Sequence, residues 1–174
     1  MNRLLPILLL LTAAPALCLD LDFAAGLGMT AEVIDHDALR DDNFAGPALV
    51  GTAAASDRVA ARLALYLWNH QDFTDADIMG AELAVLVGRG LRREGVRAYG
   101  LLGGYAENYG SLDVGRDLTG IAVGLGAGYT WPRSVLDVWV SGRSNGTYGE
   151  ILAVREMPSS YRTLNAGLSL SYRF

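Results

Sequence analysis

The amino-acid sequence predicts an all-β protein, a single antiparallel up-and-down barrel of eight strands that crosses a membrane. Three observations lead to this prediction. Apolar and polar residues alternate with a period of two over most of the chain, which is the spacing of strands. The connections between the alternating segments are long and short in turn. The face opposite the apolar one is rich in glycine, alanine and serine and carries only a few charges.

The composition limits the classes of protein to consider. The chain has 174 residues, of which 51% are hydrophobic and 19% are charged. This length fits one domain, and this hydrophobicity excludes a disordered chain. A single cysteine cannot support a disulfide framework, and a formal net charge of −5 disfavours nucleic acid as a partner. No segment reaches the roughly 18 consecutive apolar residues of a spanning helix, so the high apolar content needs another explanation.

The start of the chain has the pattern of an export signal. Arg3 gives a positive beginning, and a leucine-rich run followed by mostly small or apolar residues comes after it. Cleavage after Ala16 and cleavage after Cys18 both fit this pattern. The prediction is therefore a signal peptide over residues 1–18 and a barrel over residues 19–174.

Strand periodicity is clear in six segments. In the first of them, Leu27 and Met29 fall on one face and Gly28 falls on the other. The six segments cover residues 19–33, 59–68, 79–87, 119–131, 136–143 and 163–174. Alternation is weaker over 44–55 and 96–109, and these segments are assigned as strands because the connections around them require it.

The connections alternate strictly, beginning with a long one. The short connections lie near residues 56–58, 88–95 and 132–134. The long connections lie near residues 35–43, 69–77, 108–118 and 145–159. Three short turns and four long loops join eight strands and place both chain ends beside the short turns. The long loops hold much of the acid, whereas the second short turn is basic, with Arg89, Arg92, Arg93 and nearby Arg97.

The polar face decides which side of the barrel meets water. A soluble, lipocalin-like barrel would turn its apolar face inward, whereas a transmembrane barrel turns that face towards lipid. Small residues mixed with arginines and carboxylates fit the narrow interior of eight strands and would cover a wet exterior poorly. We therefore predict a transmembrane barrel. Because buried charges need partners, its lumen is expected to hold a polar core of Arg62, Glu82, Asp137 and Arg143.

The C-terminal segment carries a resemblance to a known family. Leu168, Leu170, Tyr172 and the terminal Phe174 alternate like the last strand of bacterial outer-membrane proteins, although Ser169 replaces the usual glycine. With the export signal and eight strands, the chain resembles the OmpA transmembrane domain, OmpX and the opacity-type surface proteins. The resemblance implies that the barrel-assembly machinery reads the four alternating residues as an assembly signal. It also implies a bacterial outer-membrane location, among lipid and lipopolysaccharide, and a mostly non-enzymatic role.

Candidate chemistry lies in two of the long loops. A histidine beside a carboxylate could activate water, in a resemblance to the rim of the larger omptin proteases, and clustered carboxylates could hold Ca²⁺ or Mg²⁺ weakly. The candidates are Asp35, His36, Asp37, His70, Asp72, Asp75 and Asp77. The simpler interpretation is a solvated acidic surface, because Asp35-x-Asp37 lacks the glycine and closing glutamate of an EF-hand. No cofactor is expected.

One further segment invites comparison with an enzyme. Ser144 and Asn145 resemble the His-x-Ser-Asn motif of the PagL lipid A deacylases, but Gly142 occupies the position of the histidine base. The leading prediction is thus a non-catalytic outer-membrane protein that presents four acidic loops for envelope structure, adhesion or partner binding. Two alternatives stay open: a lipid A-modifying or hydrolytic enzyme at the rim, and a narrow diffusion pore.

Overall fold

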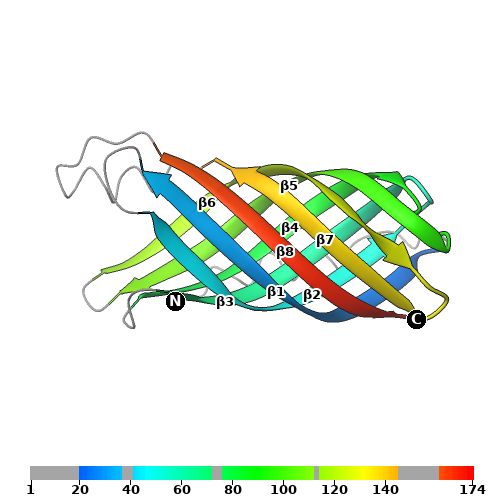
Figure 1. Cartoon of the computed structure of the whole chain (residues 1–174), viewed down its shortest axis with the longest axis horizontal. Helices are drawn as coiled ribbons and strands as arrows, with labels where there is room; N and C mark the ends of the chain where they lie inside the picture. The colour runs from blue at the N-terminus through cyan, green and yellow to red at the C-terminus, as the bar shows by residue number, and fades with distance from the viewer. Residues whose placement is uncertain (1–19, 37–40, 72–75, 112–113, 145–160) are drawn as a thin grey trace, which may run out of the picture.

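The molecule is a closed barrel of eight antiparallel strands (Figure 1). The computed structural model describes residues 20–36, 41–71, 76–111, 114–144 and 161–174. The strands are β1 (Asp22–His36), β2 (Asp42–Ala54), β3 (Val59–His70), β4 (Ala76–Arg89), β5 (Gly95–Ser111), β6 (Val114–Thr130), β7 (Ser134–Arg143) and β8 (Tyr161–Arg173). Each strand pairs with the next, and β1 pairs with β8 to close the ring. The predicted eight-stranded up-and-down barrel is confirmed, including β2 and β5, whose alternation is weak in the sequence.

The barrel has two unlike ends. At the turn end, β2–β3, β4–β5 and β6–β7 are joined by residues 55–58, 90–94 and 131–133, and the C-terminus lies beside them (Figure 1). At the opposite end, the loop end, the strands reach further than the sequence predicts. β5 extends to Ser111 and β6 begins at Val114, so most of the third expected loop, 108–118, is strand.

The extra strand length at the loop end has a physical reason. Beyond the apolar belt both faces of a sheet meet polar surroundings, so the alternation fades while backbone pairing continues to satisfy N–H and C=O groups. Asn108 pairs with Asp117 across β5 and β6, and the Asn108 amide donates to the Asp117 carboxylate at 3.1 Å. β7 ends at Arg143 and β8 begins at Tyr161, which agrees with a long fourth connection.

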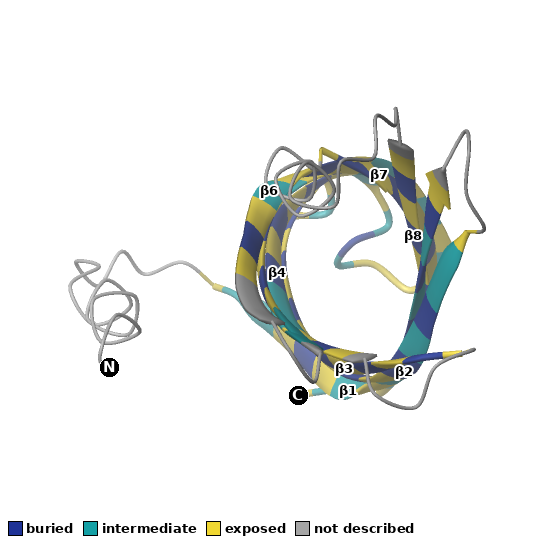
Figure 2. Ribbon diagram, turned by 90° about the vertical axis from the view of Figure 1, so that its left-hand side faces the viewer, coloured by how far each residue is buried: buried dark blue, intermediate teal, exposed yellow. Residues whose placement is uncertain are grey.

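Buried and exposed residues alternate along the strands (Figure 2). The outward face carries leucine and valine: Leu27 is 72% exposed and Leu125 is 68% exposed. The inward face carries charge, and Arg62 and Glu82 are almost completely buried. Within the described ranges, no helix is long and apolar enough to cross a membrane.

Large rings inside the barrel lie over glycines on neighbouring strands. The pairs are Tyr66 with Gly80, Tyr99 with Gly126, Tyr105 with Gly120, and Trp139 with Gly167. A Cβ atom added at Gly126 would overlap the Tyr99 ring, and one added at Gly167 would overlap the Trp139 ring. The inward glycines therefore make room for aromatic side chains that fill the lumen.

A methyl group at Gly126 tests this packing. We expect Gly126→Ala to lower the free energy of unfolding by about 1–3 kcal/mol, because the Tyr99 ring must leave its position in a filled interior. The measurement is urea-induced unfolding of the barrel in lipid vesicles. Gly104→Ala is the matched control, since a Cβ there would meet only the Gly120 carbonyl oxygen, at 3.7 Å. Equal losses in the two variants would contradict the packing argument.

Candidate functional site

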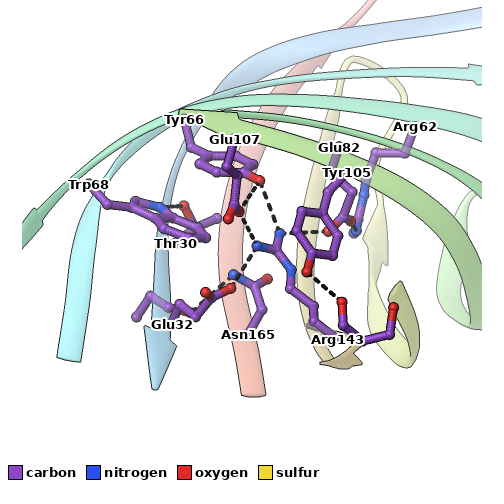
Figure 3. A network of polar contacts seen from close by, with 12 residues as sticks. Thr30, Glu32, Arg62, Tyr66, Trp68, Glu82, Tyr105, Glu107, Arg143 and Asn165 are labelled. Atoms are coloured by element: carbon purple, nitrogen blue, oxygen red, sulfur yellow. Dashed lines mark hydrogen bonds and ion pairs between the residues drawn. The ribbon is translucent and has the colours of Figure 1, made fainter. Parts of the chain in front are cut away.

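A single arginine organises the polar interior towards the loop end (Figure 3). Arg143 ends β7, and its side chain is 1% exposed. Its Nη1 donates to Glu32 Oε2 at 2.6 Å and also to Glu107, while its Nη2 donates to Glu82 Oε2 at 2.8 Å. One guanidinium thus joins carboxylates from three other strands. Charge-assisted bonds of this kind are short and directional, so they fix the side chains that meet in the bore.

Aromatic rings enclose this arginine. Its guanidinium carbon lies 4.6 Å from the Tyr105 ring centroid, 5.2 Å from that of Trp68 and 5.4 Å from that of Tyr66. The Tyr66 hydroxyl donates to Glu107 Oε1 at 2.6 Å, and the Trp68 indole donates to Thr30 Oγ1 at 2.6 Å. The ring centroids of Tyr66 and Trp68 stack at 4.1 Å. The rings exclude water and also attract the cation. This part of the lumen is therefore filled by the Arg143 cluster, which consists of Arg143 with Glu32, Glu82, Glu107, Tyr66, Trp68 and Tyr105.

A second arginine extends the cluster towards the turn end. Arg62 Nη2 donates to Glu82 Oε1 at 2.8 Å, and its guanidinium lies 4.2 Å from the Trp139 ring centroid. Its Nε and Nη1 atoms have no hydrogen-bond partner among the described residues. Donors buried in this way usually bind internal water. We therefore expect ordered water beside Arg62.

A separate ion pair lies closer to the turn end. Arg97 Nε lies 3.3 Å from Asp137 Oδ1, and the Tyr99 hydroxyl donates to the same oxygen at 3.3 Å. Both charged side chains are buried, and Arg97 Nη2 has no partner in the described part of the chain. The lumen therefore holds two polar layers, the Arg143 cluster and the Arg97–Asp137 pair.

All four residues proposed for the polar core lie in the lumen. Arg62, Glu82 and Arg143 form one network, whereas Asp137 belongs to the second layer. The sequence did not reveal that Glu107 and Arg97 complete these layers. The outward face of β5 is mostly small, with Ala98, Gly100, Gly104 and Ala106 beside Val96 and Leu102, while large side chains point inward from it. The apolar pattern of β5 therefore does not mark its lipid-facing side.

The loop candidates are only partly brought together. His70 was expected in a solvated loop, but it ends β3 with its side chain 3% exposed and its Nε2 3.2 Å from Asp42 Oδ1. The Phe44 ring lies edge-on to the His70 ring, with their centroids 4.8 Å apart. Asp35 and Asp77 are exposed residues near the loop ends of their strands. The side chain of His36 and residues Asp37, Asp72 and Asp75 lie outside the described part of the structure.

The chemistry suggested for these residues has little geometric support. Among the described residues, no group of three or more His, Cys, Asp or Glu side chains could hold a metal ion. Ser144 has a structural role: its Oγ accepts from the Ile121 amide at 2.9 Å, and its carbonyl accepts from the Tyr105 hydroxyl at 2.7 Å. Asn145 lies outside the described residues.

The outward face forms a continuous apolar belt with aromatic residues at the turn end. The ring centroids of Tyr129 and Trp131 lie 4.7 Å apart, and those of Tyr172 and Phe174 lie 5.3 Å apart. Leu168 and Leu170 lie on the same exposed face of β8 as Tyr172. The Phe174 amide donates to the Phe23 carbonyl at 2.9 Å, which fastens the chain end to β1.

The Asp57 carboxylate at the turn end lies close to backbone amides of the β4–β5 turn. Partial desolvation would raise the pKa of Asp57, but the backbone amides of Arg93 and Gly90 outweigh it and lower the pKa of this carboxyl below its usual value. The Arg93 amide donates to Asp57 Oδ1 at 3.2 Å. The β2–β3 turn is thereby joined to the β4–β5 turn.

Comparison with solved structures identifies the architecture. No known protein-family pattern and no curated protein matches the chain in sequence. The chain is similar to Ail, the attachment invasion locus protein of Yersinia pestis, with a TM-score of 0.60 and 17% identity, over 88% of this chain and 98% of that one. The chain has the fold of the small outer-membrane barrels. The resemblance drawn from its C-terminal strand is confirmed at the level of fold.

Two further structures support the same assignment. Neisserial surface protein A matches with a TM-score of 0.59 and 12% identity, over 87% of this chain and 97% of that one. The N-terminal barrel domain of Pseudomonas aeruginosa OprF matches with a TM-score of 0.51 and 16% identity, over 86% and 97%. A second Ail structure contains the heparin analogue sucrose octasulfate. At these identities the likeness establishes the fold alone.

Proposed function

We propose that this chain is a non-catalytic protein of the bacterial outer membrane, which spans the bilayer with a filled lumen and presents acidic loops outside. The observation that carries the proposal is the inverted burial pattern. Arg62, Glu82 and Arg143 are buried, whereas Leu27 and Leu125 are exposed. A barrel in water would be destabilised by exposing such an apolar belt, whereas the hydrocarbon of a membrane solvates it. A membrane also tolerates no open sheet edge, and the closed barrel has none.

The proposal includes the export of the chain and its orientation in the membrane. Residues 1–18 serve as the signal peptide, and the exposed side chains of Leu168, Leu170, Tyr172 and Phe174 serve as the assembly signal. Short turns of such barrels face the periplasm and longer loops face outside, and the loop end of this chain carries its longest connection, residues 144–160. The loop end of this chain is then the cell surface, in contact with lipopolysaccharide.

The charge of the loop end indicates the kind of external ligand. Carboxylates outnumber arginines in the long connections. Ail was solved in complex with a heparin analogue, sucrose octasulfate, but a polyanion would be repelled by this acidic surface. A cationic partner, or divalent cations between loop carboxylates and lipid phosphates, fits the charge better.

The filled lumen and the role of Ser144 favour this proposal over the two alternatives. A pore needs a continuous water path, but the Arg143 cluster packs charged and aromatic side chains across the bore (Figure 3). A rim enzyme of the PagL type needs a base beside Ser144, where the chain has Gly142. His70 does lie beside a carboxylate, that of Asp42, but the histidine side chain is buried.

The proposal predicts heat-modifiable migration on gels. The outer-membrane fraction of a cell that produces the full chain is run with and without boiling, in detergent. We expect the unboiled protein to migrate faster, because a closed barrel keeps its backbone hydrogen bonds in detergent until it is heated. Recovery in the soluble periplasm without a shift would contradict the proposal.

A further inference from the structure

The connection between β4 and β5 differs from the other two turns. Residues 90–94 fold inward across the bore at the turn end (Figure 2). Leu91 in this turn is 4% exposed and packs within the buried core, whereas Arg93 and Glu94 face solvent. The turn can reverse twice because Gly90 and Gly95 have φ values of +69° and +115°, which side chains disfavour.

Neighbouring elements hold this turn in place. The Leu91 amide donates to the Asp57 carbonyl at 3.1 Å, and the Arg93 amide donates to the Asp57 carboxylate at 3.2 Å. On another side, the Thr130 hydroxyl donates to the Gly90 carbonyl at 3.4 Å. These contacts come from the β2–β3 turn and from the end of β6, so the inward fold is anchored at more than one point of the rim.

The two end strands add a charged anchor. Arg173 at the end of β8 binds both carboxylate oxygens of Asp22 in β1, with its Nε at 2.8 and 2.9 Å from them. Its Nη2 donates at 2.6 Å to the carbonyl of Arg92, within the turn. Arg92 itself pairs with Asp20. One guanidinium therefore ties the inward turn to the seam where β1 and β8 close the barrel.

We propose that residues 90–94 are a lid that closes the turn end of the lumen, and that Arg173, held by Asp22, is its latch. Between the lid and the Arg143 cluster lie the Arg97–Asp137 pair and the donors of Arg62 and Arg97 that have no partner among the residues described. These donors bind water or small polar solutes. The lid decides whether such molecules reach this layer from the turn end. The closure itself does not depend on which compartment the turn end faces.

Thiol accessibility tests the lid. Ser169 faces the lumen opposite Asp137 and is 2% exposed, so Ser169→Cys reports on the layer behind the lid. The full chain carries this change with Cys18→Ala, is folded in detergent, and reacts with a small charged methanethiosulfonate. Folding is verified in each variant by the heat-dependent gel shift. The latch variants are Arg173→Gln and Asp22→Asn, and Leu91→Gly alters the lid without touching the chain ends.

The expected result is slow labelling of the thiol at position 169 behind the intact lid. Labelling should be about tenfold faster or more in the latch variants, since a charge-assisted bond no longer opposes opening. Arg89→Gln, which changes an exposed arginine next to the lid, should leave the rate unchanged. A reporter Ile34→Cys, buried towards the loop end, should be unaffected by every lid variant.

The outcome is decided by the comparison between latch and control variants. If Arg173→Gln does not fold, the labelling rates of the Asp22→Asn and Leu91→Gly variants test the lid instead. Equal labelling rates at position 169 with and without the latch would overturn the lid. The heat-dependent gel shift tests the membrane barrel separately, so the two proposals can fail independently.

Discussion

Replacement of Arg143 by methionine is expected to lower the free energy of unfolding by about 3–5 kcal/mol, because removing one partner of a buried ion pair leaves the others charged and unpaired. Here three glutamates are left, of which only Glu82 keeps a second guanidinium among the described residues, that of Arg62. The rings of Tyr66 and Tyr105 also lose the cation they surround. The measurement is the urea midpoint and slope for unfolding from lipid vesicles.

Two comparisons show whether the loss comes from the network. Arg89→Met removes an exposed arginine and should change stability by about 0.5 kcal/mol or less. In the Arg143→Met chain, adding Glu32→Gln and Glu107→Gln should recover part of the loss, because the uncompensated charge is then gone. A loss no larger than that of Arg89→Met would mean that the cluster contributes nothing to the folded barrel.

The elements that alternate strongly are predictable from sequence because one face of each strand meets an apolar surrounding. β3 is an example, with leucines outward and with Arg62, Tyr66 and Trp68 inward. The same alternation, continued to the end of β3, places His70 on the inward face. The polar composition around His70 favours a loop, whereas the periodicity of β3 predicts the inward position that His70 has. That signal was present in the sequence.

β5 shows where pattern alone is insufficient. Its outward face is mostly alanine and glycine, while Tyr99, Leu101 and Tyr105 point inward, and the two tyrosine rings fill space left by glycines on β6. The more hydrophobic face of β5 is therefore its inward face, so hydrophobicity alone does not assign Arg97 and Glu107 to the lumen. Which ring fits over which glycine is set by register between strands, and register is a property of the pairing rather than of either sequence segment.

The lid is invisible in the sequence for a related reason. Arg92, Arg93 and Glu94 have the composition of an ordinary polar turn, with one leucine before them. The inward direction depends on anchors far away in the chain, above all Asp57 and Arg173. The loop-end acids present the same difficulty, since the pairing of His70 with Asp42 joins the ends of two different strands.

An arginine in place of Leu125 decides whether the belt faces lipid. Leu125 lies near the middle of the outward apolar run of β6, and a charge on the lipid face at the bilayer midplane costs about 2–4 kcal/mol. We expect Leu125→Arg to lower the free energy of unfolding in vesicles by that amount, and Leu27→Arg to do so on β1. In a soluble barrel both leucines would already face water, and such surface changes alter stability by only about 0.5 kcal/mol.

The position of the arginine along the barrel axis distinguishes an effect of the lipid on stability from a local effect of the substitution. Thr119→Arg lies on the same outward face of β6 but near the loop end, where the cost should fall to about 0–1 kcal/mol. Losses at Leu125 and Leu27 with little at Thr119 therefore require a surrounding whose polarity rises along the barrel axis, which a bilayer provides and bulk water does not. Small changes at all three positions would place the belt in water. The inward charges would then have to be explained without a membrane, and the proposed function would fail at its central observation.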